Sequence, residues 1–230
     1  MLGGTRSQRT EVGDATELSK AEGVPARDRL TFTNGFYTYC SSLFVNIRGS
    51  AELAKKHRLP THARLYRAYI SEMTGPLVQR HDCLRAEHPR RRRVGPLRHH
   101  LESQIDDVFS VAAQAHSLAR ILSHKLIKAG LSLITVGLGL SYGRVLMTKA
   151  GYKDSGMNDV VWMGDAVNAA SHLSNYGNRT LQDRLLMVSD AFHDNLSEHN
   201  RPLLSRNWNR GCYHGNVINS FMDELLKVRP

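Results

Sequence analysis

The residues best suited to chemistry lie where a hydrophobic run turns into a helix. Residues 43–45 are apolar and predict a buried strand. Gly49 and Ser50 then mark a turn, after which Ser50 can cap a helix. Because N–H groups at a helix N-terminus attract anions, the backbone of residues 48–50 is suited to receive phosphate oxygens.

The remaining acids, histidines and cysteines show no metal-site pattern. Asp106 and Asp107 open a strongly periodic helix, where acids complement the helix dipole, so we assign them a structural role. The 12 histidines are scattered, without His-x-x-x-His spacing beside an acid. The three cysteines are too few and too far apart for a disulfide framework or a zinc site, and we expect them to be reduced. They are Cys40, Cys83 and Cys212.

The net charge of +10 is concentrated in one stretch of the chain. Seven arginines lie between Arg80 and His100, among them the run Arg90–Arg93. This stretch lacks the interleaved aromatic side chains of a surface that stacks nucleotide bases. We therefore expect no nucleic-acid partner.

The length of 230 residues suits one domain with an ordinary hydrophobic core. Residues 1–30 are polar and mixed and predict a flexible lead-in, whereas residues 31–230 predict a single domain. No apolar run approaches the roughly 20 residues that cross a bilayer. The first residues also lack the apolar core of a secretory signal, so we expect a cytoplasmic protein without a membrane partner.

Hydrophobic periodicity predicts alternating strands and helices. Strands are expected at 36–47, 131–140, 144–148 and 160–163, with weaker candidates at 185–189 and 203–207. Helices are expected from residue 50, over 65–77, 105–128 and 165–177, and over 217–226. The segment 131–148 is predicted to be a hairpin that turns at 141–143. This alternation predicts an α/β or α+β fold with helices packed on a sheet.

Three segments resemble the class III nucleotidyl cyclases. They are LFVNIRGS at 43–50, GLGLSYGRV at 137–145 and DVVWMGDAVNAASHL at 159–173. The resemblance covers the chain from Phe36 to its end. It implies a class III cyclase domain of ferredoxin-like α+β type, with a mostly antiparallel central sheet flanked by helices.

Segments 64–72, 161–163 and 213–219 are similar to the pyrimidine cyclases of the bacterial Pycsar antiphage system. This similarity implies a homodimer with two composite sites at its interface. Each site would convert UTP to 3′,5′-cyclic UMP and pyrophosphate, or alternatively CTP to cyclic CMP. The product would signal to a separate cyclic-nucleotide-gated effector.

The resemblance also implies the site residues. Two divalent ions, Mn²⁺ or Mg²⁺, hold the triphosphate and prefer hard oxygen ligands. The ligand positions are Asn46, the backbone carbonyl of Ile47, and a second acid in a hairpin before the helix predicted at 105–128. Asn168 would orient the ribose and His172 would act at the transition state. The implied nucleotide-binding residues are Phe44, Arg48, Gly49, Ser50 and Val161.

Three of these positions depart from the family pattern. Asn46 stands where the family has a metal-ligating aspartate, and a neutral amide is a poorer ligand. His172 stands where the family has an arginine, and histidine is largely uncharged near pH 7. Val161 replaces an acid or hydroxyl residue that reads the base in purine-specific relatives, which argues against adenine.

Residues 85–103 lack both the strand-like alternation of the family hairpin and its metal-ligating aspartate. Arg90–Arg93 cannot fill a hairpin against a core without burying unpaired charge. We hypothesise that residues 88–103 are translated out of frame, because reading one base later can encode a family hairpin whose aspartate falls at Arg91. Sequencing the gene tests this hypothesis. If the frame is intact, we expect a disturbed hairpin and little cyclase activity. The alternative function is that of a catalytically impaired cyclase-fold protein that only binds nucleotide or dimerises.

Overall fold

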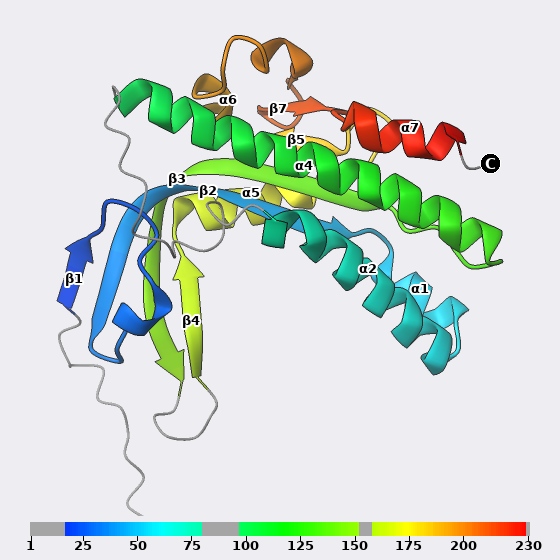
Figure 1. The fold of residues 1–230 in the computed structure, drawn as a ribbon, viewed down its shortest axis with the longest axis horizontal. Coiled ribbons are helices and arrows are strands. Elements are labelled where there is room, and N and C mark those ends of the chain that lie inside the picture. The colour runs from blue at the N-terminus through cyan, green and yellow to red at the C-terminus, as the bar shows by residue number, and fades with distance from the viewer. Residues whose placement is uncertain (1–16, 80–96, 152–157, 229–230) are drawn as a thin grey trace, which may run out of the picture.

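A computed structural model describes residues 17–79, 97–151 and 158–228 (Figure 1). The described strands form one seven-stranded sheet in the order β1-β2-β3-β5-β7-β6, with β4 paired to β3 beside this path. The strands are β1 (Glu17–Lys20), β2 (Asn34–Ile47), β3 (Val136–Gly151), β4 (Asn158–Met163), β5 (Leu186–Val188), β6 (Ser205–Asn207) and β7 (Cys212–Gly215). The α-helices are α1 (Ser50–Lys56), α2 (Leu59–Gln79), α4 (Leu97–Lys128), α5 (Asp165–Ser174), α6 (Asp190–Asp194) and α7 (Ser220–Val228).

Strands β2 and β3 form the centre of the sheet. They pair antiparallel without a break, from Gly35 opposite Thr148 to Ile47 opposite Val136. The pairs β3–β4, β5–β7 and β6–β7 are also antiparallel, whereas β1–β2 and β3–β5 are parallel. The expected α/β class with a mostly antiparallel sheet is therefore confirmed.

Helices cover both faces of this sheet. Because side chains alternate along a strand, residues 43, 45 and 47 of β2 point to one face, where they pack with α2 and α4 in the main core. Leu138 and Leu140 of β3 are fully buried in the same core. Figure 1 shows α4 crossing this part of the sheet, while β1 and β4 extend away from it.

Helix α5 packs on the opposite face, directly against the backbone of β3. A Cβ atom added at Gly139 would lie 2.0 Å from the carbonyl oxygen of Ala170, and one at Gly137 would lie 2.3 Å from the carbonyl oxygen of Ser174. No other residue type fits at such distances. The glycines of the 137–145 segment thus bring α5 into contact with the central strands.

The predicted hairpin at 131–148 is wrong. Residues 141–143 continue β3 in the extended conformation, because each of them is paired with a residue of β2. Ser141 and Gly143 are common in turns, but here both lie within β3, and Gly143 is next to Ala166 of α5. Residues 141–143 have the composition of a turn, but their pairing with β2 keeps them extended.

Residues 17–30 of the predicted flexible lead-in have a defined structure, so the prediction is wrong for them. Glu17–Lys20 forms β1 and pairs with the start of β2, and a 3₁₀ turn follows at Arg27–Arg29. Leu30 is buried with Phe36 and Met147 on the face of the sheet that α5 also covers. Ala21, Val24 and Leu30, which follow β1, therefore cover a part of this face that α5 leaves open.

The long central helix begins earlier than expected. Since α4 starts at Leu97, Asp106 and Asp107 lie inside the helix and not in its first turn. The Asp106 carboxylate instead accepts a hydrogen bond from the backbone N–H of Ser197 at 3.2 Å. The structural role assigned to Asp106 holds, although its cause is a long-range contact.

Other expected elements agree with the structure. The strands at 36–47 and 160–163 and the helices after residues 50 and 164 are confirmed by β2, β4, α1 and α5. The helix from residue 50 ends before Pro60, which lies in the first turn of α2, where its fixed φ is tolerated. Arg91 and the arginine run lie outside the described residues. Across 17–79, 97–151 and 158–228, none of the helices combines the length and apolar character of a bilayer-crossing segment.

Candidate active site

The turn between β2 and α1 is built on Gly49. Its φ of 62° lies in the left-handed region, which glycine adopts without steric cost. Gly49 is the N-cap of α1, and its carbonyl accepts the first helical hydrogen bond from Leu53 at 3.0 Å. The expected capping by the Ser50 side chain is wrong, because Ser50 is the first residue of the helix. Gly49 and Ser50 are both exposed.

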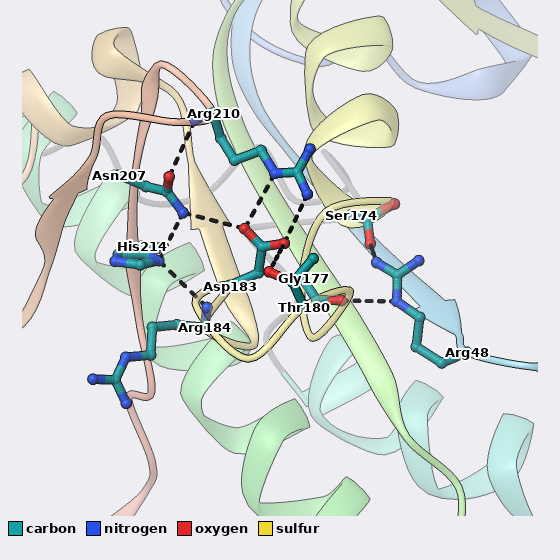
Figure 2. A network of polar contacts seen from close by, with 9 residues as sticks. All are labelled: Arg48, Ser174, Gly177, Thr180, Asp183, Arg184, Asn207, Arg210 and His214. Carbon is teal, nitrogen blue, oxygen red and sulfur yellow. Dashed lines mark hydrogen bonds and ion pairs between the residues drawn. The ribbon is translucent and has the colours of Figure 1, made fainter.

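The side chain of Arg48 points away from this turn, toward the end of α5 (Figure 2). Its Nε donates a hydrogen bond to the carbonyl oxygen of Gly177 at 2.7 Å, and its Nη2 donates to that of Ser174 at 2.6 Å. Burial, and then the positive charge of Arg179, lower the pKa of Arg48, but a guanidinium stays charged in proteins. The cation therefore lies at the negative end of the α5 dipole, against the carbonyl of its last residue and that of Gly177 in the following loop.

Asn46, at the implied metal position, also contacts the end of α5. Its Nδ2 donates a hydrogen bond to Oδ1 of Asn175 at 2.6 Å. Asn175 is the C-cap of α5, and its own Nδ2 donates to the carbonyl oxygen of Ser171 at 3.2 Å. The strand end and the helix end are thus joined by side chains as well as by close backbone packing.

Asn168 and His172 lie one helical turn apart on α5. Both are exposed, while Ala166, Ala170 and Leu173 of the same helix are buried. The i, i+4 spacing places the two polar side chains on one side of the helix. The structure therefore presents Asn168 and His172 together to solvent.

The other residues predicted to bind the nucleotide do not all lie on the face of the sheet that α5 covers. Phe44 is 36% exposed and lies opposite Gly139, on the α5 side of the sheet. Val161 is 39% exposed and lies opposite Thr148, on the other side. Ile47 is half-buried against the main core. Within one chain, Val161 therefore does not lie near Asn46 and Ile47 at the C-terminal end of β2.

A surface hollow of about 370 Å³ opens beside the β2–α1 turn. The hollow carries both positive and negative side chains, and it lies next to the backbone suited to phosphate. Its lining residues are Arg48, Gly49, Glu52, Leu53, Lys56, Ser132 and Leu133.

The loop that follows α5 is fixed at its far end by a buried acid (Figure 2). Asp183 accepts hydrogen bonds from Nη2 of Arg210 at 2.9 Å and from the Thr180 hydroxyl at 2.8 Å. These donors, Arg210 above all, lower the pKa of Asp183 to about 2. Arg48 contacts the start of this loop at Gly177, and Arg210 contacts its end at Asp183, so both ends of the loop are fixed.

His214 completes this network. Its Nδ1 accepts hydrogen bonds from Nδ2 of Asn207 at 3.1 Å and from the backbone N–H of Arg184 at 3.3 Å. Burial, and then the charge of Arg184, lower the pKa of His214. The ring therefore serves as a neutral acceptor at the start of β5.

The described residues near Asn46 do not fit a two-ion site. Hard divalent cations require oxygen ligands, usually carboxylates. Among the residues with a described structure, no three or more His, Cys, Asp or Glu side chains gather to hold a metal ion. Asn46 offers one neutral amide oxygen, and the second ligand position, Arg91, lies in the undescribed segment.

The fold is that of the class III cyclases. The chain superposes with a TM-score of 0.63 on a crystal structure of a class III adenylyl cyclase-like ATP-binding protein from Pseudomonas aeruginosa. This match covers 92% of the chain and 46% of that protein at 14% identity, so it speaks for the fold alone. No family model matches the chain.

Two curated relatives define the family more closely. The chain is 35% identical over 190 residues to a uridylate cyclase of Treponema porcinum, covering 82% of the chain and 66% of the relative. It is 30% identical over 201 residues to a uridylate cyclase of Gulbenkiania mobilis, covering 82% of the chain and 76% of that relative. The chain belongs to the class III nucleotidyl cyclases, in the family of these uridylate cyclases.

Sequence patterns did not identify two residues of the candidate site. Asn175 follows a helix that was predicted, but nothing in its spacing indicates Asn46 as its partner. Lys56 ends a helix and is an ordinary dipole-complementing residue by sequence. Only the three-dimensional arrangement places Lys56 in the same hollow as the β2–α1 turn.

Proposed function

We propose that this chain is a uridylate cyclase, which converts UTP to 3′,5′-cyclic UMP and pyrophosphate. The observation that carries the proposal is the identity of 30–35% over 82% of the chain to two uridylate cyclases. The segments that carry the resemblance contain the end of β2, the close-packed glycines of β3 and all of α5 but its last residue.

The chain acts as a homodimer with two composite sites. Asn168 and His172 are exposed on α5, whereas the Asn46 and Arg48 side chains are occupied by the end of the same helix. A nucleotide at the strand end therefore takes its Asn168 and His172 from the second chain. Val161, on the far side of the sheet, then faces the base across the interface.

The reaction closes a ring within one nucleotide. The ribose 3′-oxygen attacks the α-phosphorus, the bond from this phosphorus to the β-bridging oxygen breaks, and pyrophosphate leaves while the hydroxyl proton passes to solvent. Asn168 orients the ribose, and His172 donates a hydrogen bond to the α-phosphate. The backbone of residues 48–50 receives the terminal phosphates, and Lys56 adds positive charge beside them.

Two divalent ions serve this reaction in the class, and Asn46 is a weak ligand for them. We therefore expect slow turnover. By resemblance, cyclic UMP is a second messenger for a separate effector in antiphage defence. The Asn46 amide favours a second candidate function, in which the chain binds UTP and dimerises without catalysis.

Incubation of the purified protein with each of the four NTPs and Mn²⁺, followed by mass spectrometry, tests the proposal. Cyclic UMP should exceed cyclic CMP, and the Asn168→Ala chain should form neither. Cyclic AMP or cyclic GMP as the main product would refute the proposal. UTP binding without any cyclic product would establish the second candidate.

A further inference from the structure

The guanidinium of Arg48 is committed to a helix end. It contacts the carbonyl oxygens of Ser174 and Gly177 with two different nitrogens, at 2.6 and 2.7 Å (Figure 2). Ser174 is the last residue of α5, and the last carbonyls of a helix have no partner inside the helix, so its oxygen needs an external donor. Gly177 lies in the loop that follows, so Arg48 joins the helix end to this loop. A planar guanidinium donates to the two acceptors from separate nitrogens in a fixed fork, whereas a lysine offers one nitrogen on a flexible stem.

Two further contacts fix the same helix end. Asn46 holds Asn175 from β2, and Gly137 and Gly139 leave no gap between β3 and the last turns of α5. A shift of α5 along its axis would break all of these contacts together. Asn168 and His172 lie on this helix, within two turns of the fixed end.

We propose that Arg48 is a positioning residue that sets the place of α5, and so acts on the composite site completed by Asn168 and His172 of its own chain. This inference rests on the proposed function. In the dimer, that site holds its nucleotide at the strand end of the second chain. Arg48 thus affects the site that contains α5 of its own chain more than the site that contains its own β2–α1 turn.

The opposing hypothesis is that the Arg48 side chain binds phosphate in the nearer site. The two hypotheses assign the effect of one substitution to different sites. A dimer with a single working site can therefore distinguish them.

Such a dimer pairs two differently tagged chains. The first carries Asn168→Ala, so only the site with the first chain's strand end and the second chain's α5 still works. Arg48→Lys is then placed in either chain, and cyclic UMP formation is measured over a range of UTP concentrations. With Arg48→Lys in the second chain, kcat should be about tenfold lower than with Arg48→Lys in the first chain. KM should change little, because a misplaced catalytic group slows the chemical step.

An equal loss from both placements, or a larger loss from the first chain, would overturn the proposal. Arg64→Lys, on an exposed position of α2, is the matched control and should leave kcat unchanged in either chain. Absence of cyclic UMP from every dimer, including the one without an Arg48 change, would contradict the proposed function instead.

Amide hydrogen exchange tests the contact without nucleotide. The N–H groups of Asn175 and Tyr176 donate to the carbonyls of His172 and Leu173 at the end of α5. Arg48→Lys should speed exchange of these amides, whereas Arg64→Lys should not. Unchanged exchange in the Arg48→Lys chain would refute the positioning role, whatever the activity.

Discussion

Nδ2 of Asn46 donates a hydrogen bond to Oδ1 of Asn175 at 2.6 Å, which joins the implied metal position to the end of α5. A carboxylate at this position could not donate. In the Asn46→Asp chain, the Asn175 amide would have to turn its Nδ2 toward the new acid and give up its bond to Ser171. We expect a loss of about 1 kcal/mol in the free energy of unfolding without divalent ions.

Added Mn²⁺ should reverse this loss in the Asn46→Asp chain, because an ion that binds only the folded state stabilises it. Urea unfolding with and without Mn²⁺ measures both effects. Asn209→Asp, the same substitution in an exposed turn, is the control and should gain nothing from Mn²⁺. Equal stabilisation of the wild-type chain by Mn²⁺ would contradict this view of Asn46.

The contact between α5 and β3 predicts that Gly139→Ala is severely destabilising. The new methyl group would lie 2.0 Å from the Ala170 carbonyl oxygen and 2.4 Å from the Ser174 nitrogen. We expect a loss of about 3 kcal/mol or more in unfolding free energy. Gly143→Ala places its methyl 3.5 Å from the nearest atom, Ala166 Cβ, and should cost less than about 0.5 kcal/mol. Similar urea midpoints for the two variants would argue against the close packing.

Asp183 predicts a loss of stability in acid. Its pKa is about 2 when folded, against an ordinary 3.8, so the unfolded chain binds the proton more readily. The resulting stabilisation, roughly 2 kcal/mol, is complete above about pH 5, and most of it is lost as the pH falls from 4 to 2. Asp183→Asn should lose this stability at pH 7, and its unfolding free energy should fall less between pH 4 and pH 2.

Urea unfolding at pH 7, 4 and 2.5 measures this difference. Glu198→Gln removes an exposed acid and should follow the wild-type profile. A wild-type profile in the Asp183→Asn chain would show that the ion pair with Arg210 contributes nothing.

Several elements could be predicted from sequence because their signals are local. β2 and α5 have clear apolar periods, and the 159–173 segment identified the helix that carries Asn168. β1 and β7 were not predicted, since four-residue strands at 17–20 and 212–215 are defined by their partners and not by their own pattern. The continuity of β3 likewise depends on its pairing with β2.

The candidate site was only partly predictable for the same reason. The turn at residues 48–50 follows from glycine and helix chemistry. The side-chain partners of Arg48 and Asn46 are 126–129 residues away in the sequence, so no spacing rule reveals them. The assignment of Arg48 as a nucleotide-binding residue stays a prediction for its backbone, while its side chain contacts α5.

His172 predicts that a permanent charge at this position speeds the reaction. His172→Arg places a guanidinium on the exposed side of α5, where negative charge develops on the phosphate. We expect cyclic UMP formation to rise about tenfold in kcat at pH 8. His124→Arg, on an exposed position of α4, adds the same charge elsewhere and should change nothing. A slower His172→Arg enzyme would exclude a role for His172 beside the phosphate.

Complementation between two defective chains tests the composite dimer most directly. One chain carries Asn46→Asp and Asn168→Ala and supplies only a strand end, and the other carries Asn46→Ala and supplies only α5. Each chain alone should form almost no cyclic UMP. In a statistical mixture, half of the dimers contain one chain of each kind, and each of these dimers has one working site of two. The mixture should therefore recover about a quarter of the rate of the Asn46→Asp parent. A mixture that forms mixed dimers but remains as inactive as its components would contradict the composite site.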